Sequence, residues 1–170
     1  MTAMVSAIGT MLLRELVTLR KEIEGYQSGE QLWRLVPGIS NSGGTLALHL
    51  TGNLQHFIGA VLGGSGYVRD RDAEFSTRNL PRAEILNRID TTTAVLSRTF
   101  TTLTESVLES RYPEAVARMR VSTGDFLVHL LSHLAYHLGQ LDYHRRMTTG
   151  SGPLEGSLNP SKLMSAVKLD

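Results

Sequence analysis

The sequence predicts an all-α protein, a four-helix bundle with one long crossover connection. Two observations carry this prediction. Four long segments repeat apolar residues at spacings of three and four, and no two segments alternate as paired strands would. Four amphipathic helices of roughly 20 residues with shorter connections are typical of a bundle. The longest connection without a clear helix joins the second and third helices, which leaves room for a crossover.

The first helix is defined by an apolar stripe that ends near residues 25–29. The members of the stripe are Ile8, Leu12, Leu16, Leu19, Ile23 and Tyr26. We expect a short helical turn around Leu32 and Trp33, before Pro37 stops it, because proline cannot continue a helix.

The second helix is expected over residues 45–62. The preceding loop, 37–44, is rich in glycine, serine and asparagine, and Asn41 or Ser42 is a suitable N-cap. Glycines follow at 63, 64 and 66. A mixed-charge stretch, 67–78, is expected to be a loop.

The third helix begins near Pro81, where the missing N–H of proline is harmless. Its apolar stripe is expected to run from Ile85 to Val107. Residues 111–120 then form a connection. The fourth helix opens at Ser122 and Asp125, which have capping-box spacing, and runs to about residue 146.

This pattern divides the chain into a bundle over residues 1–147 and a C-terminal extension over 148–170. The extension holds glycine, serine and proline and has little periodicity. We expect one short helical turn in it, at residues 161–167.

Composition excludes several classes of function. Lysine and arginine number 17 against 16 aspartates and glutamates, so no charge excess favours nucleic acid or an anionic membrane as a partner. No apolar run approaches the roughly 20 residues that span a bilayer. The N-terminal apolar run has no basic residue before Arg14, which argues against a signal peptide and for a cytoplasmic location.

The chain has no cysteine, so disulfides, thiolate metal ligands and a cysteine nucleophile are excluded. Any thiol chemistry requires a thiol from outside the protein. Any metal site must use histidine, carboxylate or backbone oxygen ligands.

Four of the six histidines lie in residues 129–144. His133 and His137 are four residues apart, so they share a helix face with Cβ atoms about 5–6 Å apart and can reach one metal ion. His129 and His133 have the same spacing. A second helix must supply a further ligand, and His49 and His56 lie on the apolar second helix.

A histidine on an apolar face is more often a core residue that is hydrogen-bonded to a backbone carbonyl. The functional interpretation therefore depends on two histidine-bearing helices facing each other. We expect His56, His129 and His144 to be bystanders, groups that support the ligands, or surface residues, with solvent around His144 beside Arg145 and Arg146.

The stretch HLLSHLAYHLGQLDYHRR, 129–146, resembles the last-helix motif of the DinB-like superfamily of metal-binding four-helix bundles. The matching residues are His133, His137, Gly139 and Gln140. The stretch 48–59 resembles the second-helix motif of that superfamily, in which His49 is the third ligand. The resemblance covers residues 5–147. Many members carry a histidine after the second ligand, whereas this chain has Leu138.

This resemblance implies a divalent metal, zinc or nickel, held by His49, His133 and His137. It also implies a homodimer and a small-molecule substrate. Some relatives transfer a low-molecular-weight thiol such as bacillithiol or mycothiol, or use it for isomerisation, and we expect a thiol-dependent S-transferase or isomerase. The alternatives are a metal-dependent hydrolase and a non-enzymatic, metal-stabilised dimeric binding protein.

Hydrolysis usually requires a general base, and the histidine motif contains no carboxylate. Asp72 or Glu74 could reach the site, although a solvated, internally paired loop is the simpler interpretation of residues 69–75. Asn53, one turn after His49, could orient a ligand or water. We expect Tyr136 to pack in the core, and we expect the small Gly139 to let another helix approach.

Overall fold

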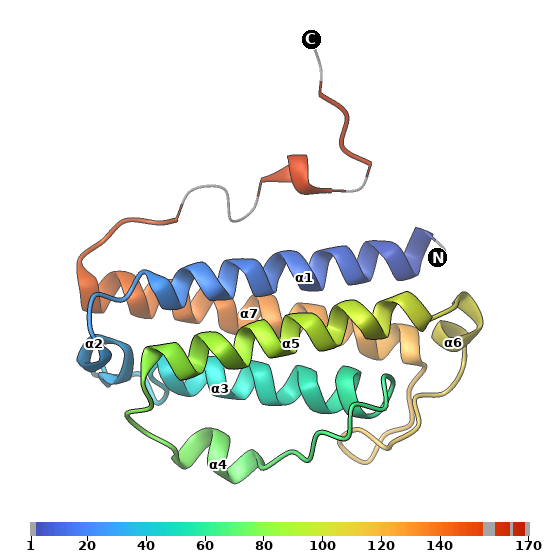
Figure 1. Ribbon diagram of the computed structural model, residues 1–170, viewed down its shortest axis with the longest axis horizontal. Coiled ribbons are helices and arrows are strands. Elements are labelled where there is room, and N and C mark those ends of the chain that lie inside the picture. Colours follow the sequence, from blue (N-terminus) through green and yellow to red (C-terminus); the bar gives the residue numbers. More distant parts are fainter. Residues whose placement is uncertain (1–2, 155–158, 164, 169–170) are drawn as a thin grey trace.

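A computed structural model of the protein describes residues 3–154, 159–163 and 165–168. Its four long helices form the bundle that the sequence predicts (Figure 1). They are α1 (Ala3–Glu24), α3 (Gly43–Leu54), α5 (Arg82–Thr102) and α7 (Thr123–Thr149). Shorter helices lie in the connections: α2 (Gly29–Trp33), α4 (Arg71–Ser76) and α6 (Glu105–Glu109).

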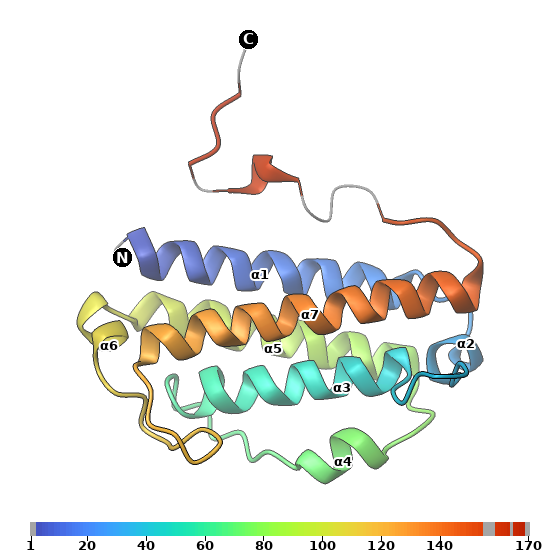
Figure 2. The ribbon, with the colours of Figure 1, turned by 180° about the vertical axis from the view of Figure 1, so that it is seen from behind.

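The order of the helices around the bundle follows from their packing. Both α1 and α3 pack on α5 and on α7, so α1 lies diagonally opposite α3. Helices α1 and α7 run in one direction and α3 and α5 in the other (Figures 1 and 2). Since α3 and α5 are consecutive, parallel and in contact, their connection must return along the length of the bundle. The predicted crossover is therefore confirmed.

The core lies where the apolar stripes of the four helices meet. Leu12, Leu16 and Leu19 of the first stripe are fully buried, as are Leu50 of α3 and Leu134 of α7. Burying such side chains contributes about 1.5–3 kcal/mol each, which is why the stripes determine how each helix is rotated toward the core.

The observed helix caps are those predicted from the sequence, whereas several other helix boundaries differ from the prediction. Ser42 accepts a hydrogen bond from the backbone N–H of Thr45, and Ser122 accepts one from Asp125. The third apolar stripe, however, is not one helix, because α5 ends at Thr102 and an extended Leu103 precedes α6. In the described part of the tail, a 3-10 turn lies at Pro160–Lys162, earlier than the turn expected at 161–167.

The crossover contains a short helix, α4, where the sequence predicted only a loop. Asp70 caps α4 by accepting a hydrogen bond from the backbone N–H of Ala73, and this short helix packs on α3. Helix α3 itself continues into a single π-helical turn, Gln55–Ala60. Such turns are frequently found at functional sites.

The C-terminal end of α7 is buried, which corrects the expectation of solvent around His144. The side chain of His144 is 1% exposed, and its Nε2 donates to the backbone carbonyl of Arg34, 2.8 Å away. Its Nδ1 then accepts from the hydroxyl of Tyr26 at 2.7 Å. Arg145 is also 1% exposed and is paired with the buried Glu22 at 2.5 Å.

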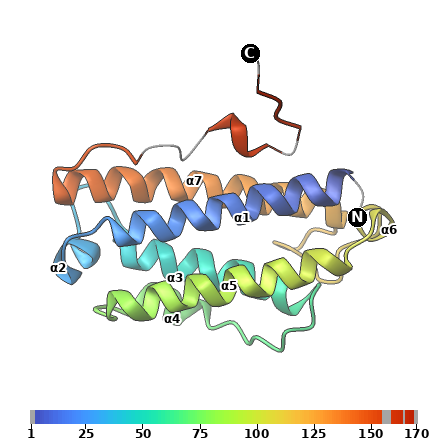
Figure 3. The same cartoon turned by 45° about the horizontal axis from the view of Figure 1, so that its top comes forward.

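None of the described helices is both long enough and apolar enough to cross a bilayer. Figure 3 shows the described tail segments beyond α7 on the side of the bundle that carries α1 and α7.

Candidate metal centre

Three histidines converge between α3 and α7. His49 projects from α3, and His133 and His137 project from successive turns of α7. One nitrogen from each imidazole can be chosen so that the three lie within 4.8 Å of one another. Nε2 of His49 lies 3.3 Å from Nε2 of His133. The structure thus brings together the three residues that the sequence singled out.

Glu74 of the crossover helix α4 holds the ring of His49. Its Oε2 accepts a hydrogen bond from Nδ1 of His49 at 3.0 Å, and Arg69 binds both carboxylate oxygens at 2.7 and 2.9 Å. The carboxylate lies against Gly52 of α3, where a Cβ atom would collide with it. A histidine that donates from Nδ1 presents the lone pair of Nε2, so this contact fixes the ligand atom.

Gln140 performs the same role for His137. Its side-chain Oε1 lies 2.7 Å from Nδ1 of His137, three residues earlier on α7. The amide oxygen can only accept, so Nδ1 of His137 carries the proton and Nε2 carries the lone pair. Nδ1 of His133, by contrast, is buried without a hydrogen-bond partner among the described residues.

The electrostatics of the site keep His133 and His137 neutral. Burial, together with the neighbouring His137 and His49, lowers the pKa of His133 from 6.5 to about 4. Burial also lowers the pKa of His137, against the opposing effect of its bond to Gln140. Neutral imidazoles are the form that binds metal ions, so the lone pairs are available at neutral pH.

The carboxylate beside them is charged. Burial alone would raise the pKa of Glu74, but the hydrogen bonds from Arg69 and His49 outweigh it, and the pKa is lowered from 4.5. Three imidazoles backed by a carboxylate and an amide can bind a divalent cation, and imidazole ligands suit zinc, copper, iron and nickel.

The remaining histidines lie outside the triad. His129 is exposed and stacks on Phe126, with ring centroids 6.0 Å apart. His56 lies on the π-helical turn, and its Nε2 is 3.2 Å from the carboxylate of Glu114. Neither belongs to the cluster of three.

Other candidate residues take positions that the sequence did not reveal. Asp72 is exposed, so Glu74 is the carboxylate that reaches the triad, as a partner of His49. Asn53 is buried, and its Oδ1 has no partner among the described residues. The expectation that Tyr136 packs in the core is wrong, since it is 66% exposed. No described helix approaches Gly139, where a Cβ atom would meet no described atom within 4 Å.

Arg69 and Gln140 were not recognised as site residues from the sequence. Gln140 belongs to the last-helix motif, and its spacing from His137 was the available signal. Arg69 and Glu74 are five residues apart across a helix N-terminus, and no sequence pattern identifies that pair as buried.

The bundle and its histidine cluster define a metal-binding four-helix bundle of the DinB-like superfamily. The family model of the mycothiol-S-transferases matches residues 7–150. The chain therefore belongs to the mycothiol-S-transferase family. Comparison with curated proteins and with solved structures gave no match.

Proposed function

We propose that the protein is a metal-dependent thiol S-transferase that joins mycothiol, or a similar low-molecular-weight thiol, to an electrophilic small molecule. The observation that carries the proposal is the convergence of His49, His133 and His137 on one point, with their ligand nitrogens within 4.8 Å. Membership of the mycothiol-S-transferase family supports the choice of thiol. The proposed metal is zinc or nickel.

A divalent cation held by the triad would supply Lewis acidity, which lowers the pKa of a coordinated thiol or water. The residues of the chain provide orientation. Glu74 and Gln140 hold the protons on the Nδ1 atoms of His49 and His137, so that both Nε2 atoms point toward the shared site. The chain has no cysteine of its own, in keeping with a thiol that arrives as a cosubstrate.

The positions of the carboxylates favour thiol transfer over hydrolysis. A hydrolase of this kind would need a general base that is free to take a proton from water. The carboxylate of Glu74 already accepts hydrogen bonds from His49 and, at both oxygens, from Arg69. Asp72 is exposed to solvent. Isomerisation with a thiol cofactor would use the same site, and substrate screening separates it from transfer.

The proposal includes a cytoplasmic homodimer that binds neither nucleic acid nor membranes. A net charge of +1 gives the chain no overall excess of positive charge to release counterions from DNA. We expect a dimer in sedimentation and no salt-dependent DNA binding. A metal-stabilised dimeric binding protein without activity is the alternative, and it predicts metal binding without turnover.

The test is a conjugation assay. Protein loaded with zinc or nickel is mixed with mycothiol and a fluorogenic bimane electrophile, and conjugate formation is compared with protein-free and chelated samples. We expect turnover that rises with metal content and is absent in His137→Ala. If protein with one bound metal per chain gives only the uncatalysed rate across a panel of electrophiles and thiols, the transferase assignment fails.

A further inference from the structure

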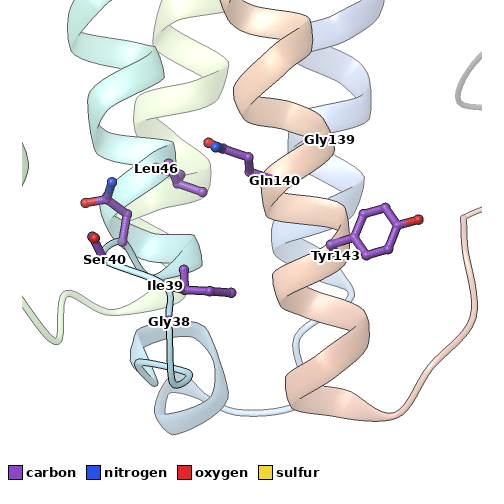
Figure 4. Close-up of a pocket in the computed structure, with 8 residues that line it drawn as sticks. Gly38, Ile39, Ser40, Leu46, Gly139, Gln140 and Tyr143 are labelled. Atoms are coloured by element: carbon purple, nitrogen blue, oxygen red, sulfur yellow. The ribbon is translucent and has the colours of Figure 1, made fainter.

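The three histidines of the triad differ in what holds the outer nitrogen of each ring. Nδ1 of His49 is bound by Glu74 at 3.0 Å, and Nδ1 of His137 is bound by Gln140 at 2.7 Å. The Gln140 side chain extends from α7 toward α3, at the edge of a groove of about 520 Å³ (Figure 4). Nδ1 of His133 is buried and has no partner among the described residues. The described fold thus supports two of the three rings from outside.

His133 has to change its tautomer to bind a metal ion through Nε2. Nδ1 of His49 donates to Glu74, so Nε2 of His49 carries a lone pair. The hydrogen bond across the 3.3 Å between the two Nε2 atoms therefore takes its proton from Nε2 of His133. A ligand nitrogen must present a lone pair instead, which places the proton of a neutral ring on Nδ1. Nδ1 is then a buried donor, and it opposes metal binding unless it finds an acceptor.

Asn53 is a buried acceptor on the same face of α3 as His49. It follows His49 by four residues and is 7% exposed, and its Oδ1 has no partner in the described part of the chain. Buried polar atoms are nearly always hydrogen-bonded, so an unpaired one requires an explanation. Thr51, another buried polar residue of α3, differs in this respect, because its hydroxyl donates to carbonyl groups of its own helix.

The contacts between α3 and α7 place Asn53 opposite the turn of α7 that precedes His133. The two helices run in opposite directions (Figures 1 and 2). His49 meets His133, and Phe57 meets Phe126 with ring centroids 5.0 Å apart. Asn53 lies midway along α3 between these two contacts. Side chains of a helix lean toward its N-terminus, so the ring of His133 leans toward the turn that Asn53 faces.

That turn offers Asn53 no buried polar partner of its own. Of residues 129–132, Leu130 is the buried one, and its side chain is apolar. His129 is exposed and stacks on Phe126. Nδ1 of His133 is therefore the buried group on this stretch of α7 that can pair with the amide oxygen.

We propose that Asn53 is a positioning residue, which accepts a hydrogen bond from Nδ1 of His133 when the triad binds a metal ion. Asn53 thereby does for His133 what Glu74 and Gln140 do for the other two ligands. The inference rests on the metal site of the proposed function and not on its thiol chemistry. Metal binding moves the proton of His133 from Nε2 to Nδ1, and the acceptor that stabilises this tautomer comes from the facing helix.

The test measures the zinc affinity of three variants of the full chain by competition with a chromophoric chelator. Asn53→Leu keeps a side chain of similar volume and removes the acceptor, whereas Asn53→Asp keeps an acceptor. Thr51→Val is the matched control, because it removes a buried hydroxyl of α3 that bonds to its own helix. Circular dichroism and urea unfolding establish that each variant is folded.

We expect Asn53→Leu to bind zinc about 10- to 100-fold more weakly than wild type, which is the usual effect of losing such a partner. Asn53→Asp should bind zinc at least as tightly as wild type, since a carboxylate is the stronger acceptor. Thr51→Val should bind zinc as wild type does.

NMR of zinc-saturated protein with ¹⁵N-labelled histidine provides a readout that a general loss of stability does not change. Wild type should show a protonated Nδ1 and a metal-bound Nε2 for all three ligands. In Asn53→Leu the Nδ1 proton of His133 should move upfield, because it has lost its hydrogen bond. The Nδ1 protons of His49 and His137 should stay where they are, since Glu74 and Gln140 still hold them.

Unchanged zinc affinity or an unchanged His133 signal in Asn53→Leu would overturn the proposal. Equal shifts of all three Nδ1 protons would overturn it too, and so would zinc binding by Asn53→Asp that is as weak as in Asn53→Leu. A shift of the His129 signal in place of the His133 signal would make His129 the partner of Asn53. Wild-type protein that binds no zinc would overturn this proposal together with the metal site, whereas zinc binding without thiol conjugation contradicts the proposed function alone.

Discussion

The carboxylate of Glu74 and the ring of His49 form the closest link between the crossover and the metal centre. Oε2 of Glu74 lies 3.0 Å from Nδ1 of His49, and Arg69 donates to both oxygens of the same carboxylate. The crossover thus does more than connect two parallel helices. It supplies the group that determines which nitrogen of His49 faces His133 and His137.

Replacing Glu74 by glutamine should weaken metal binding. The neutral amide no longer pairs with Arg69 and makes His49 a poorer ligand, and loss of such partners typically reduces metal affinity about 10- to 100-fold. Competition with a chromophoric chelator measures the change. Asp72→Asn, an exposed change on the same helix α4, is the control and should bind as wild type. Equal affinity in both variants would show that Glu74 does not support the ligand.

Removing a ligand should abolish tight metal binding, and removing a bystander should not. We expect His49→Ala, His133→Ala and His137→Ala each to lose stoichiometric metal, since two imidazoles remain. The apo bundle should still fold, because its apolar stripes do not need the ion. Metal analysis after dialysis provides the measurement.

His129→Ala and His144→Ala provide the comparison for that series. Both should retain metal, although His144→Ala should be less stable because His144 is buried and hydrogen-bonded to Tyr26 and Arg34. Metal retained by His137→Ala and lost by His129→Ala would move the site one turn toward the start of α7.

Alanine substitutions at two glycines should change the stability of the fold in opposite directions. At Gly52 a Cβ atom collides with the carboxylate of Glu74, so Gly52→Ala should destabilise the fold by about 1–3 kcal/mol and weaken metal binding with it. At Gly139 there is open space, so Gly139→Ala should stabilise α7 by about 0.5–1 kcal/mol without changing metal affinity. Urea unfolding measures the stability changes, and chelator competition measures metal affinity. Stability changes of the same sign in the two variants would contradict the packing argument.

The stability that His144 provides should depend on pH. Burial lowers the pKa of His144 from 6.5, against the opposing effect of its bond to the Arg34 carbonyl. A folded-state pKa below the unfolded one means that this stability is complete above about pH 6.5 and is lost as the pH falls toward the folded value. The stability difference between wild type and His144→Phe should therefore be larger at pH 7.5 than at pH 5.5. A difference that stays constant or widens on acidification would contradict this.

The sequence predicted the bundle and two of the three histidines of the triad because both follow from helical periodicity. The apolar stripes placed the four long helices, and the four-residue spacing of His133 and His137 placed two ligands on one face. The third ligand required two helices to face each other, and His49 was identified through the resemblance. The capping serines, Ser42 and Ser122, were equally local features.

Errors arose where burial depends on residues far away in the chain. His144 and Arg145 were expected at an exposed helix end. They are buried, because Tyr26 contacts His144 and Glu22 contacts Arg145, each from more than 100 positions away in the sequence. Tyr136 was predicted to pack in the core, although it is exposed on the outer face of α7. The break between α5 and α6 interrupts an apolar stripe that periodicity alone would continue.

The most direct test of a thiol-activating histidine triad is zinc X-ray absorption spectroscopy of the loaded protein before and after the addition of mycothiol. We expect three imidazole scatterers in the absence of thiol, from His49, His133 and His137. Addition of mycothiol should introduce one sulfur scatterer at about 2.3 Å. Fewer than three imidazoles, or a spectrum unchanged by saturating mycothiol, would contradict the claim that this histidine triad is a thiol-activating metal centre.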